Sequence, residues 1–160
     1  MKIILGSDKS GFTLKEFIKA YFDENKIEYI EIGTTDINAP FPFFAVAPAA
    51  CEMLQKGEAD RAILVCGTGM GMNQVANKYK GVRAAVAESL YAAKMCRAVN
   101  DSNVLCMGGW ITAPEMGLEM AKTFLATGFT EGLEEWRQDF LINAKREFGV
   151  IEDRIYCCCN

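Results

Sequence analysis

Residues 62–72 read Ala62-Ile63-Leu64-Val65-Cys66-Gly67-Thr68-Gly69-Met70-Gly71-Met72, an uninterrupted apolar run followed by alternating glycines. An apolar run of this length is typical of a strand that is buried on both faces of a parallel sheet. Alternating glycines let the backbone turn tightly and approach a ligand closely. The segment therefore predicts a buried strand, a ligand-facing turn and the start of a helix.

Short apolar runs alternate with amphipathic stretches on both sides of this segment. The predicted strands are residues 2–6, 27–32, 59–66, 81–87 and 103–107. The predicted helices are residues 10–24, 43–56, 72–79, 88–99, 114–127 and 131–148. This order predicts an α/β fold, a single-domain, Rossmann-like, doubly wound parallel sheet of about five strands with helices on both faces. We assign residues 1–150 to the domain and residues 151–160 to a C-terminal tail.

Composition excludes several classes of function. The chain has 160 residues, a formal net charge of −4, no histidine and seven cysteines. An acidic chain without a basic cluster is not expected to bind nucleic acid, and no run approaches the roughly 20 apolar residues of a membrane span. An odd number of cysteines in apolar segments favours reduced thiols in a cytoplasmic protein. Without histidine the chain lacks the commonest general base and metal ligand, and we expect no metal.

In doubly wound folds, ligands bind beyond the carboxyl ends of the strands, at a switch in strand order. We therefore expect the site in the loops at residues 7–11, 67–71 and 99–103. Amide groups in the glycine-rich loop suit an anion or a developing oxyanion. Cys66 beside such donors is the best candidate base, and Thr68 can exchange a hydrogen bond there. The alternative is a tight turn with an incidental cysteine.

Two polar residues follow the first predicted strand. Asp8 either caps the next helix or binds a sugar hydroxyl. Lys9 either holds a phosphate or carbonyl oxygen or is a solvated surface charge. At the other end of the chain, three adjacent cysteines at 157–159 cannot all face one metal ion. They are therefore expected in a disordered or apolar-packed tail rather than a metal site.

Four ordered segments resemble one family, that of ribose-5-phosphate isomerase B and galactose-6-phosphate isomerase. The matching segments are Gly6-Ser7-Asp8-Lys9-Ser10-Gly11-Phe12 with Leu14-Lys15, Cys66–Met72 with Ala76-Asn77-Lys78, Gly81-Val82-Arg83-Ala84-Ala85, and Asn100-Asp101-Ser102-Asn103-Val104-Leu105. They follow one another across about residues 3–112 at the family's separations.

The resemblance implies an aldose–ketose isomerase without metal or organic cofactor that moves a proton between C1 and C2 of a sugar phosphate through a cis-enediolate. In the branch with this signature, Cys66 is the C–H base and Thr68 assists at the sugar oxygens. Asp8 and Asn100 bind sugar oxygens. The backbone anion hole is formed by Gly67, Gly69, Met70 and Gly71. Other members place a glutamate base where this chain has Met72, so Cys66 has no rival.

Several family residues are replaced. Ring-opening members carry a histidine where this chain has Val99, which cannot transfer a proton. A histidine that often follows the first aspartate is Lys9 here, an aromatic hydroxyl is replaced by Phe41, and an arginine after the penultimate strand by Trp110. The late phosphate-binding segment aligns poorly and retains Arg137 as its candidate cation.

These replacements favour a substrate that is already acyclic, such as a tetrose 4-phosphate, because its esterified O4 cannot close a furanose. A ring that opens unaided, or a substrate without phosphate, also fits. The resemblance further implies a homodimer or tetramer with sites shared between subunits. Two alternatives stay open: one subunit of a heteromeric isomerase built with a paralogue, and a non-catalytic sugar-phosphate-binding protein.

Overall fold

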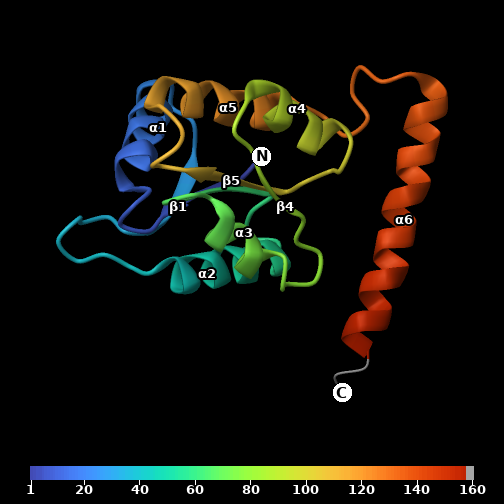
Figure 1. The fold of residues 1–160 in the computed structure, drawn as a ribbon, viewed down its shortest axis with the longest axis horizontal. Coiled ribbons are helices and arrows are strands. Elements are labelled where there is room, and N and C mark those ends of the chain that lie inside the picture. The colour runs from blue at the N-terminus through green and yellow to red at the C-terminus, as the bar shows by residue number, and fades with distance from the viewer. Residues whose placement is uncertain (158–160) are drawn as a thin grey trace.

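Five parallel strands form the middle layer of the computed structural model, which describes residues 1–157 (Figure 1). The strands are β1 (Ile3–Ser7), β2 (Tyr29–Gly33), β3 (Arg61–Cys66), β4 (Ala84–Val86) and β5 (Val104–Gly108). Their order across the sheet is β2-β1-β3-β5-β4. Residues of β1 and β5 are all buried, and so are those of β3 after its first residue, because helices cover both faces of these central strands. The continuous apolar run of β3 follows from this position.

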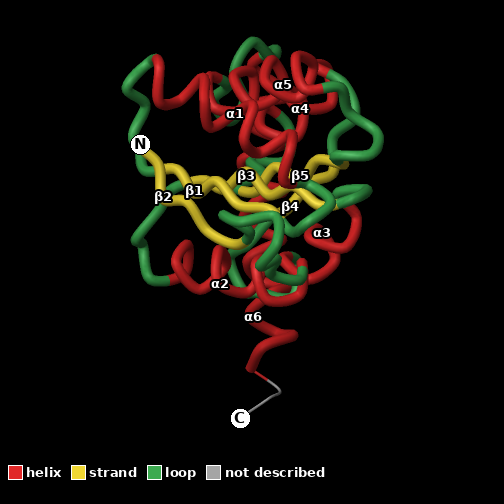
Figure 2. Tube along the Cα trace, turned by 90° about the vertical axis from the view of Figure 1, so that its left-hand side faces the viewer, coloured by secondary structure: helices red, strands yellow, loops and turns green. Residues whose placement is uncertain are grey.

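Helices cover both faces of the sheet, as Figure 2 shows with the sheet seen in yellow between them. The helices are α1 (Phe12–Glu24), α2 (Phe43–Gln55), α3 (Met70–Ala76), α4 (Leu90–Ala98), α5 (Pro114–Ala126) and α6 (Glu135–Cys157). Helices α1, α4 and α5 lie on one face, and α2 and α3 on the other (Figure 1). Each face encloses its own apolar core. The predicted α/β class, strand number and two-sided helix cover are confirmed.

The chain reverses its direction of travel across the sheet at β1. Strand β2 pairs with one side of β1 and β3 with the other, with Ser7 opposite both Gly33 and Val65. The connections that leave the carboxyl ends of β1 and β3 therefore pass to opposite faces and leave a crevice between them. The two loops in that crevice are Asp8–Gly11 and Gly67–Gly69.

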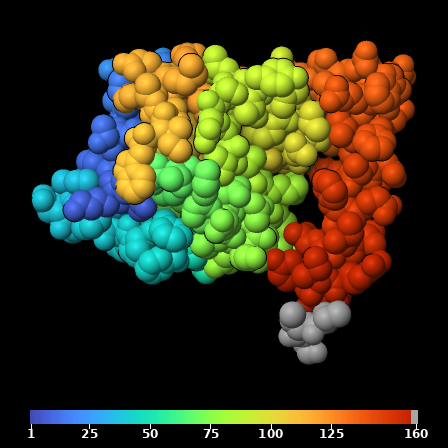
Figure 3. All heavy atoms as spheres, in the orientation of Figure 1, coloured from blue at the N-terminus to red at the C-terminus, as the bar shows by residue number. Residues whose placement is uncertain are grey.

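The C-terminal helix differs most from the prediction. Helix α6 begins at Glu135 rather than residue 131 and continues to Cys157, so residues 151–157 of the predicted tail are helical. Leu141 is its one buried residue among those described. Figure 3 shows α6 at one side of the body with an opening between them. Cys157 is exposed, while Cys158 and Cys159 lie outside the described residues.

Side chains of the chain's own motifs set two other boundaries. Asn77 ends α3 and bridges to the start of β4, accepting a hydrogen bond from the Ala84 amide at 2.9 Å and donating one to the Ala84 carbonyl at 3.0 Å. This pairing keeps α3 to seven residues, so it is shorter than predicted. Across residues 1–157, no helix has both the length and the apolar character needed to span a bilayer.

Candidate active site

Cys66 is the last residue of β3 and lies at the floor of the crevice. The turn after β5 closes one side of the crevice, where the Gly109 amide donates to the Cys66 carbonyl at 2.7 Å. The residue is 4% exposed. The thiol therefore sits at the carboxyl edge of the sheet in a largely dehydrated position, where a base can act on a bound C–H group.

The loop after Cys66 presents backbone amides to the crevice. Gly69 has φ +77°, and a Cβ there would also lie 3.0 Å from the backbone carbon of Met107. Only glycine adopts this conformation without strain, so the bend of the loop depends on it. Within the described residues, no acceptor is paired with the amides of Gly67, Thr68, Gly69 and Gly71. These four donors are available to an oxyanion, whereas the Met70 amide, which was expected among the donors, donates within the loop to the Thr68 hydroxyl oxygen.

Thr68 takes part in the same loop. Its hydroxyl oxygen accepts a hydrogen bond from the Met70 amide at 3.3 Å. This contact fixes the side chain beside the free amides and leaves the hydroxyl proton for another acceptor. Helix α3, which follows, has only seven residues, so the loop amides rather than a long helix dipole supply the positive potential.

Trp110 forms a wall of this loop, and sequence reasoning noted it only as a missing arginine. A Cβ on Gly67 would lie 2.8 Å from the indole ring, so the ring lies directly against this glycine. The Trp110 amide also donates to the Gly67 carbonyl at 3.0 Å. With 73% of its surface exposed, the indole is accessible to a ligand or to a second protein chain.

The loop after β1 lies beside the cysteine. The Asp8 amide donates to the Val65 carbonyl at 3.2 Å, which joins this loop to the residue before Cys66. One Asp8 carboxylate oxygen accepts from the Gly11 amide at 3.0 Å. Burial raises the pKa of the Asp8 carboxyl, against the lowering effect of the Gly11 and Ser10 amides. Asp8 does not cap α1, because the N-cap residue is Gly11 and no described side chain caps the helix, so of the two predicted roles the sugar-binding one stays a prediction.

A hollow of about 290 Å³ opens next to Asp8. It is lined by Asp8, Lys9, Pro40, Phe41, Pro42 and Phe43. Sequence reasoning missed Phe43, whose ring lies 3.0 Å from where a Cβ on Gly71 would be. The aromatic cluster at residues 41–44 was the signal that could have indicated it. A larger hollow of about 630 Å³ lies at the amino-terminal ends of β1 and β2, away from Cys66.

The other buried cysteines are poor candidates for a base. Burial raises the pKa of Cys51 to about 12 and that of Cys96 to about 11. Burial also raises the pKa of Cys106 well above its ordinary value. These three thiols supply almost no thiolate near neutral pH, and they pack as small apolar groups. No group of three or more candidate metal ligands occurs in the described chain.

The third predicted loop lies at the wrong edge of the sheet for a site made by one chain. Residues 99–103 precede β5, and the Asn103 carbonyl accepts from Ala62 at the start of β3. Asn100 and Val99 therefore lie at the amino-terminal edge, opposite Cys66. Arg137 is exposed on the first turn of α6, which runs along that same side of the molecule (Figure 1). The expectation that residues 99–103 lie with the other two loops beyond the carboxyl ends of the strands is therefore wrong.

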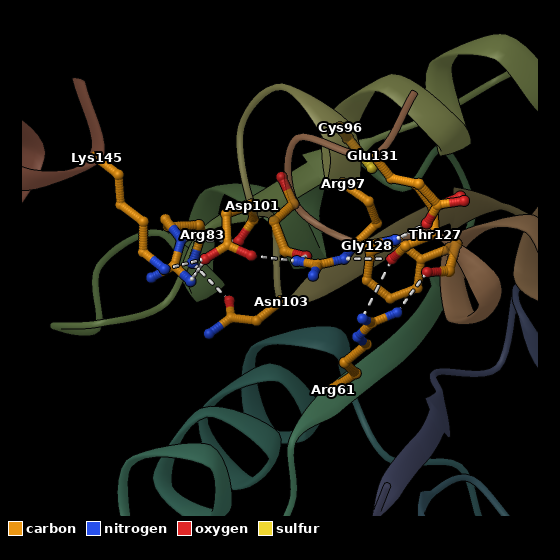
Figure 4. A network of polar contacts seen from close by, with 12 residues as sticks. Arg61, Arg83, Cys96, Arg97, Asp101, Asn103, Thr127, Gly128, Glu131 and Lys145 are labelled. Atoms are coloured by element: carbon orange, nitrogen blue, oxygen red, sulfur yellow. Dashed lines mark hydrogen bonds and ion pairs between the residues drawn. The ribbon is translucent and has the colours of Figure 1, made fainter. Parts of the chain in front are cut away.

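A network of ion pairs and hydrogen bonds surrounds Asp101, the residue after Asn100 (Figure 4). Asp101 has φ +49° and forms ion pairs with Arg83 at 2.9 Å, Arg97 at 2.8 Å and Lys145 at 2.5 Å. Burial alone would raise the pKa of the Asp101 carboxyl, but these three cations lower it. Asn103 fixes the other end by accepting from the Arg83 amide at 2.8 Å. The network presents Asn100 at the surface.

The chain is similar to known isomerases over most of its length. The family model described as Ribose/Galactose Isomerase matches residues 3–141. The chain is 60% identical over 156 residues to 4-deoxy-4-sulfo-D-erythrose isomerase of Clostridium sp. (strain MSTE9), with 98% of each chain covered. It is 36% identical over 133 residues to D-erythrulose-4-phosphate isomerase 2 of Mycolicibacterium smegmatis, covering 81% of this chain and 86% of the relative.

A solved structure agrees with these sequence relationships. The ribose-5-phosphate isomerase B of Clostridium thermocellum superimposes with a TM-score of 0.84 at 34% sequence identity. The match covers 97% of this chain and 99% of that protein. The likeness therefore includes the sheet, the crevice between β1 and β3 and most of α6.

Proposed function

Because the chain belongs to the ribose/galactose isomerase family and is an aldose–ketose isomerase, we propose that it acts on a four-carbon sugar with an anionic group at C4. The leading substrate is 4-deoxy-4-sulfo-D-erythrose, interconverted with its 2-ketose. One observation carries the proposed isomerase chemistry. The buried Cys66 thiol ends β3 directly before a loop with four backbone amides that have no acceptor among the described residues.

The proposed reaction begins with Cys66. Its thiolate removes the proton from C2 of the open-chain aldose, and negative charge develops on the carbonyl oxygen at C1. The amides of Gly67, Thr68, Gly69 and Gly71 stabilise that oxyanion, where each donor in comparable sites is worth about 10²–10³ in rate. The protonated thiol then returns a proton to C1 while the O2 proton passes to O1, which gives the ketose and restores the thiolate. We assign the relay between O2 and O1 to the Thr68 hydroxyl, whose oxygen accepts from the Met70 amide and whose proton is available.

Chain length follows from the chemistry of C4. A sulfonate bonded directly to C4 leaves no hydroxyl to close a furanose, and a phosphate ester at O4 blocks it equally. Such substrates are acyclic, so no proton donor is needed to open a ring. Val99, which has no titratable group, is consistent with this. Two relatives named for four-carbon sugars, at 60% and 36% identity, support the same length.

Charge favours a sulfonate over a phosphate. Among the described residues that line the 290 Å³ hollow, Lys9 is the one cation, and Asp8 beside it adds negative charge. A phosphate monoester carries about −1.5 to −2 at pH 7, whereas a sulfonate carries a single charge. One lysine can balance the monoanion but leaves the phosphate dianion only partly compensated.

We further propose that two copies of the chain complete each site. Asn100 and Cys66 lie at opposite edges of one sheet, so Asn100 can reach substrate only in the crevice of a second copy. Two features support this arrangement. The Asp101 network ties down the Asn100 loop at the surface, and α6 exposes large apolar side chains, including Trp136 and Phe140. In a two-fold dimer each chain would contribute its Asn100 loop and its α6 to the interface, so the dimer would contain two equivalent sites.

Steady-state kinetics with a substrate panel tests the proposed substrate class. We expect turnover of 4-deoxy-4-sulfo-D-erythrose with kcat/KM at least about tenfold above that of erythrose 4-phosphate, because a tenfold ratio needs only about 1.4 kcal/mol of charge compensation. Ribose 5-phosphate, which is mostly cyclic, is expected to react at least about a hundredfold more slowly. Comparable kcat/KM values for ribose 5-phosphate and the sulfonate would contradict the proposal.

A further inference from the structure

A fully buried lysine lies behind the active-site crevice and takes no part in the reaction described above. Lys15 is in the second turn of α1 and its side chain is 0% exposed. Its ammonium group lies 2.5 Å from a carboxylate oxygen of Glu31 on β2 and 2.8 Å from Glu16. It also donates to the Thr34 carbonyl at 2.7 Å. A buried ammonium group needs such compensation, but the carbonyl contact also links it to a loop.

Thr34 is the point where that loop leaves the sheet, and it is held on three sides. Its carbonyl accepts from Lys15, its amide donates to the Ser7 carbonyl at 2.8 Å, and its hydroxyl oxygen accepts from the Phe41 amide at 3.0 Å. Thr34 is itself fully buried, whereas residues 35–42 are exposed. The loop is thus attached to the body mainly through Thr34 at one end and α2 at the other.

Phe41 carries this attachment into the active site. It lines the same hollow as Asp8 and Lys9, and Phe43 two residues later lies against Gly71 of the amide-rich loop. A continuous path therefore runs from the Lys15 ammonium group through Thr34 to the wall of the hollow. Each step of that path is a hydrogen bond with a distance of 3.0 Å or less.

We propose that Lys15 is a positioning residue that fixes the Thr34–Phe41 pair and so sets the wall of the hollow that holds the substrate's C4 end. Its partner Glu31 is held in the charged form by the same contact. Burial alone would raise the pKa of Glu31, but hydrogen bonds from Lys15 and Lys19 lower it. Under the proposed function this wall faces the C4 end of the substrate, so Lys15 is expected to act on substrate binding rather than on proton transfer between C1 and C2. The kinetic part of this inference rests on the proposed function.

Lys19 provides a matched control. It lies one helical turn after Lys15 and binds the other oxygen of Glu31 at 2.6 Å, so it shares the carboxylate. Within residues 1–157, its hydrogen bond and ion pair are both with Glu31 and do not include Thr34 or the loop. Lys15→Met is expected to raise KM about tenfold while kcat changes less than about threefold, and Lys19→Met to change neither more than about twofold. If Lys15→Met does not fold, the double variant Lys15→Met with Glu31→Gln replaces it in the experiment, because it also removes the carboxylate charge that Lys15 leaves unpaired.

Thr34 variants test the path with Lys15 intact. Thr34→Ala removes the acceptor of the Phe41 amide and is expected to reproduce the rise in KM, whereas Thr34→Ser keeps an oxygen and is expected to behave like the wild type. Combining Thr34→Ala with Lys15→Met is expected to add little, because the two contacts that they remove are successive steps of one path to Phe41. Fully additive effects, or equal changes in kcat and KM for Lys15→Met, would overturn the proposal.

Hydrogen exchange of the Phe41 amide decides the question without catalysis. Proline has no amide hydrogen, so Phe41, which lies between Pro40 and Pro42, gives an isolated signal. We expect its exchange to accelerate at least about tenfold in Lys15→Met and Thr34→Ala, and to stay unchanged in Lys19→Met. This result would stand even if the wild type converted none of the sugars, which would reject only the proposed function. Unchanged Phe41 exchange in Lys15→Met would reject the positioning role.

Discussion

Replacing Cys66 by alanine is expected to lower kcat on the four-carbon substrate about 10³-fold, within the range of a lost general base. The described chain offers no substitute, since burial raises the pKa of Cys51, Cys96 and Cys106. KM is expected to change less than about threefold, because the backbone amides and the hollow remain. Initial rates of ketose formation, measured in samples quenched at fixed times over a range of substrate concentrations, give both kcat and KM.

Cys157 gives the control for this variant. It is the exposed cysteine at the end of α6, far from the crevice, and Cys157→Ala should keep wild-type kinetics. The thermal transition of Cys66→Ala should be recorded beside it, because the removed sulfur is buried and leaves a small cavity. A folded Cys66→Ala protein with kcat within tenfold of the wild type would exclude Cys66 as the base.

Mixing two inactive variants should restore activity if each site is shared. Cys66→Ala lacks the base, and Asn100→Ala is expected to lower kcat/KM about 10²-fold by removing a polar contact made in the transition state. After dissociation and random reassociation of a two-fold dimer, half of the dimers are mixed, and each mixed dimer has one complete site. The expected activity is therefore about one quarter of the wild-type value.

The matched control mixes Cys66→Ala with Thr68→Val. Cys66 and Thr68 belong to the same loop of one chain, so no mixed dimer contains a complete site and activity should stay at the level of the separate variants. Mass spectrometry of differently tagged chains shows whether exchange has occurred. Complete exchange without recovery in the Asn100→Ala mixture would contradict the shared site. An inactive wild type that becomes active only with a paralogue would favour the heteromeric alternative.

The sheet and the cysteine loop could be predicted because local pattern and burial agree there. The run before Cys66 is apolar on both faces since β3 lies in the middle of the sheet. Alternating glycines after it match the left-handed Gly69 and the close approach of Trp110 to Gly67. Such features depend on neighbouring residues in the chain, and a single sequence records them directly.

Other parts depend on contacts that the sequence does not record. The predicted strand at residues 103–107 already placed residues 99–103 before it, at the amino-terminal edge of a parallel sheet. What one sequence does not record is whether a second chain brings Asn100 to the crevice. Helix α6 has one buried residue, Leu141, so its apolar positions gave no clear core-facing stripe and its last two turns were predicted as a tail. Long-range contacts place Trp110 and Phe43 against the loop.

The central claim is that this chain isomerises an acyclic four-carbon sugar by proton transfer. NMR of 4-deoxy-4-sulfo-D-erythrose with the wild-type enzyme in deuterated water tests it most directly. We predict conversion to the 2-ketose together with deuterium at C1 of the ketose and C2 of the aldose, because a thiol base exchanges its proton with solvent over repeated turnovers. Conversion with both C–H positions fully protonated would contradict the enediolate mechanism, and no conversion at all would contradict the proposed substrate.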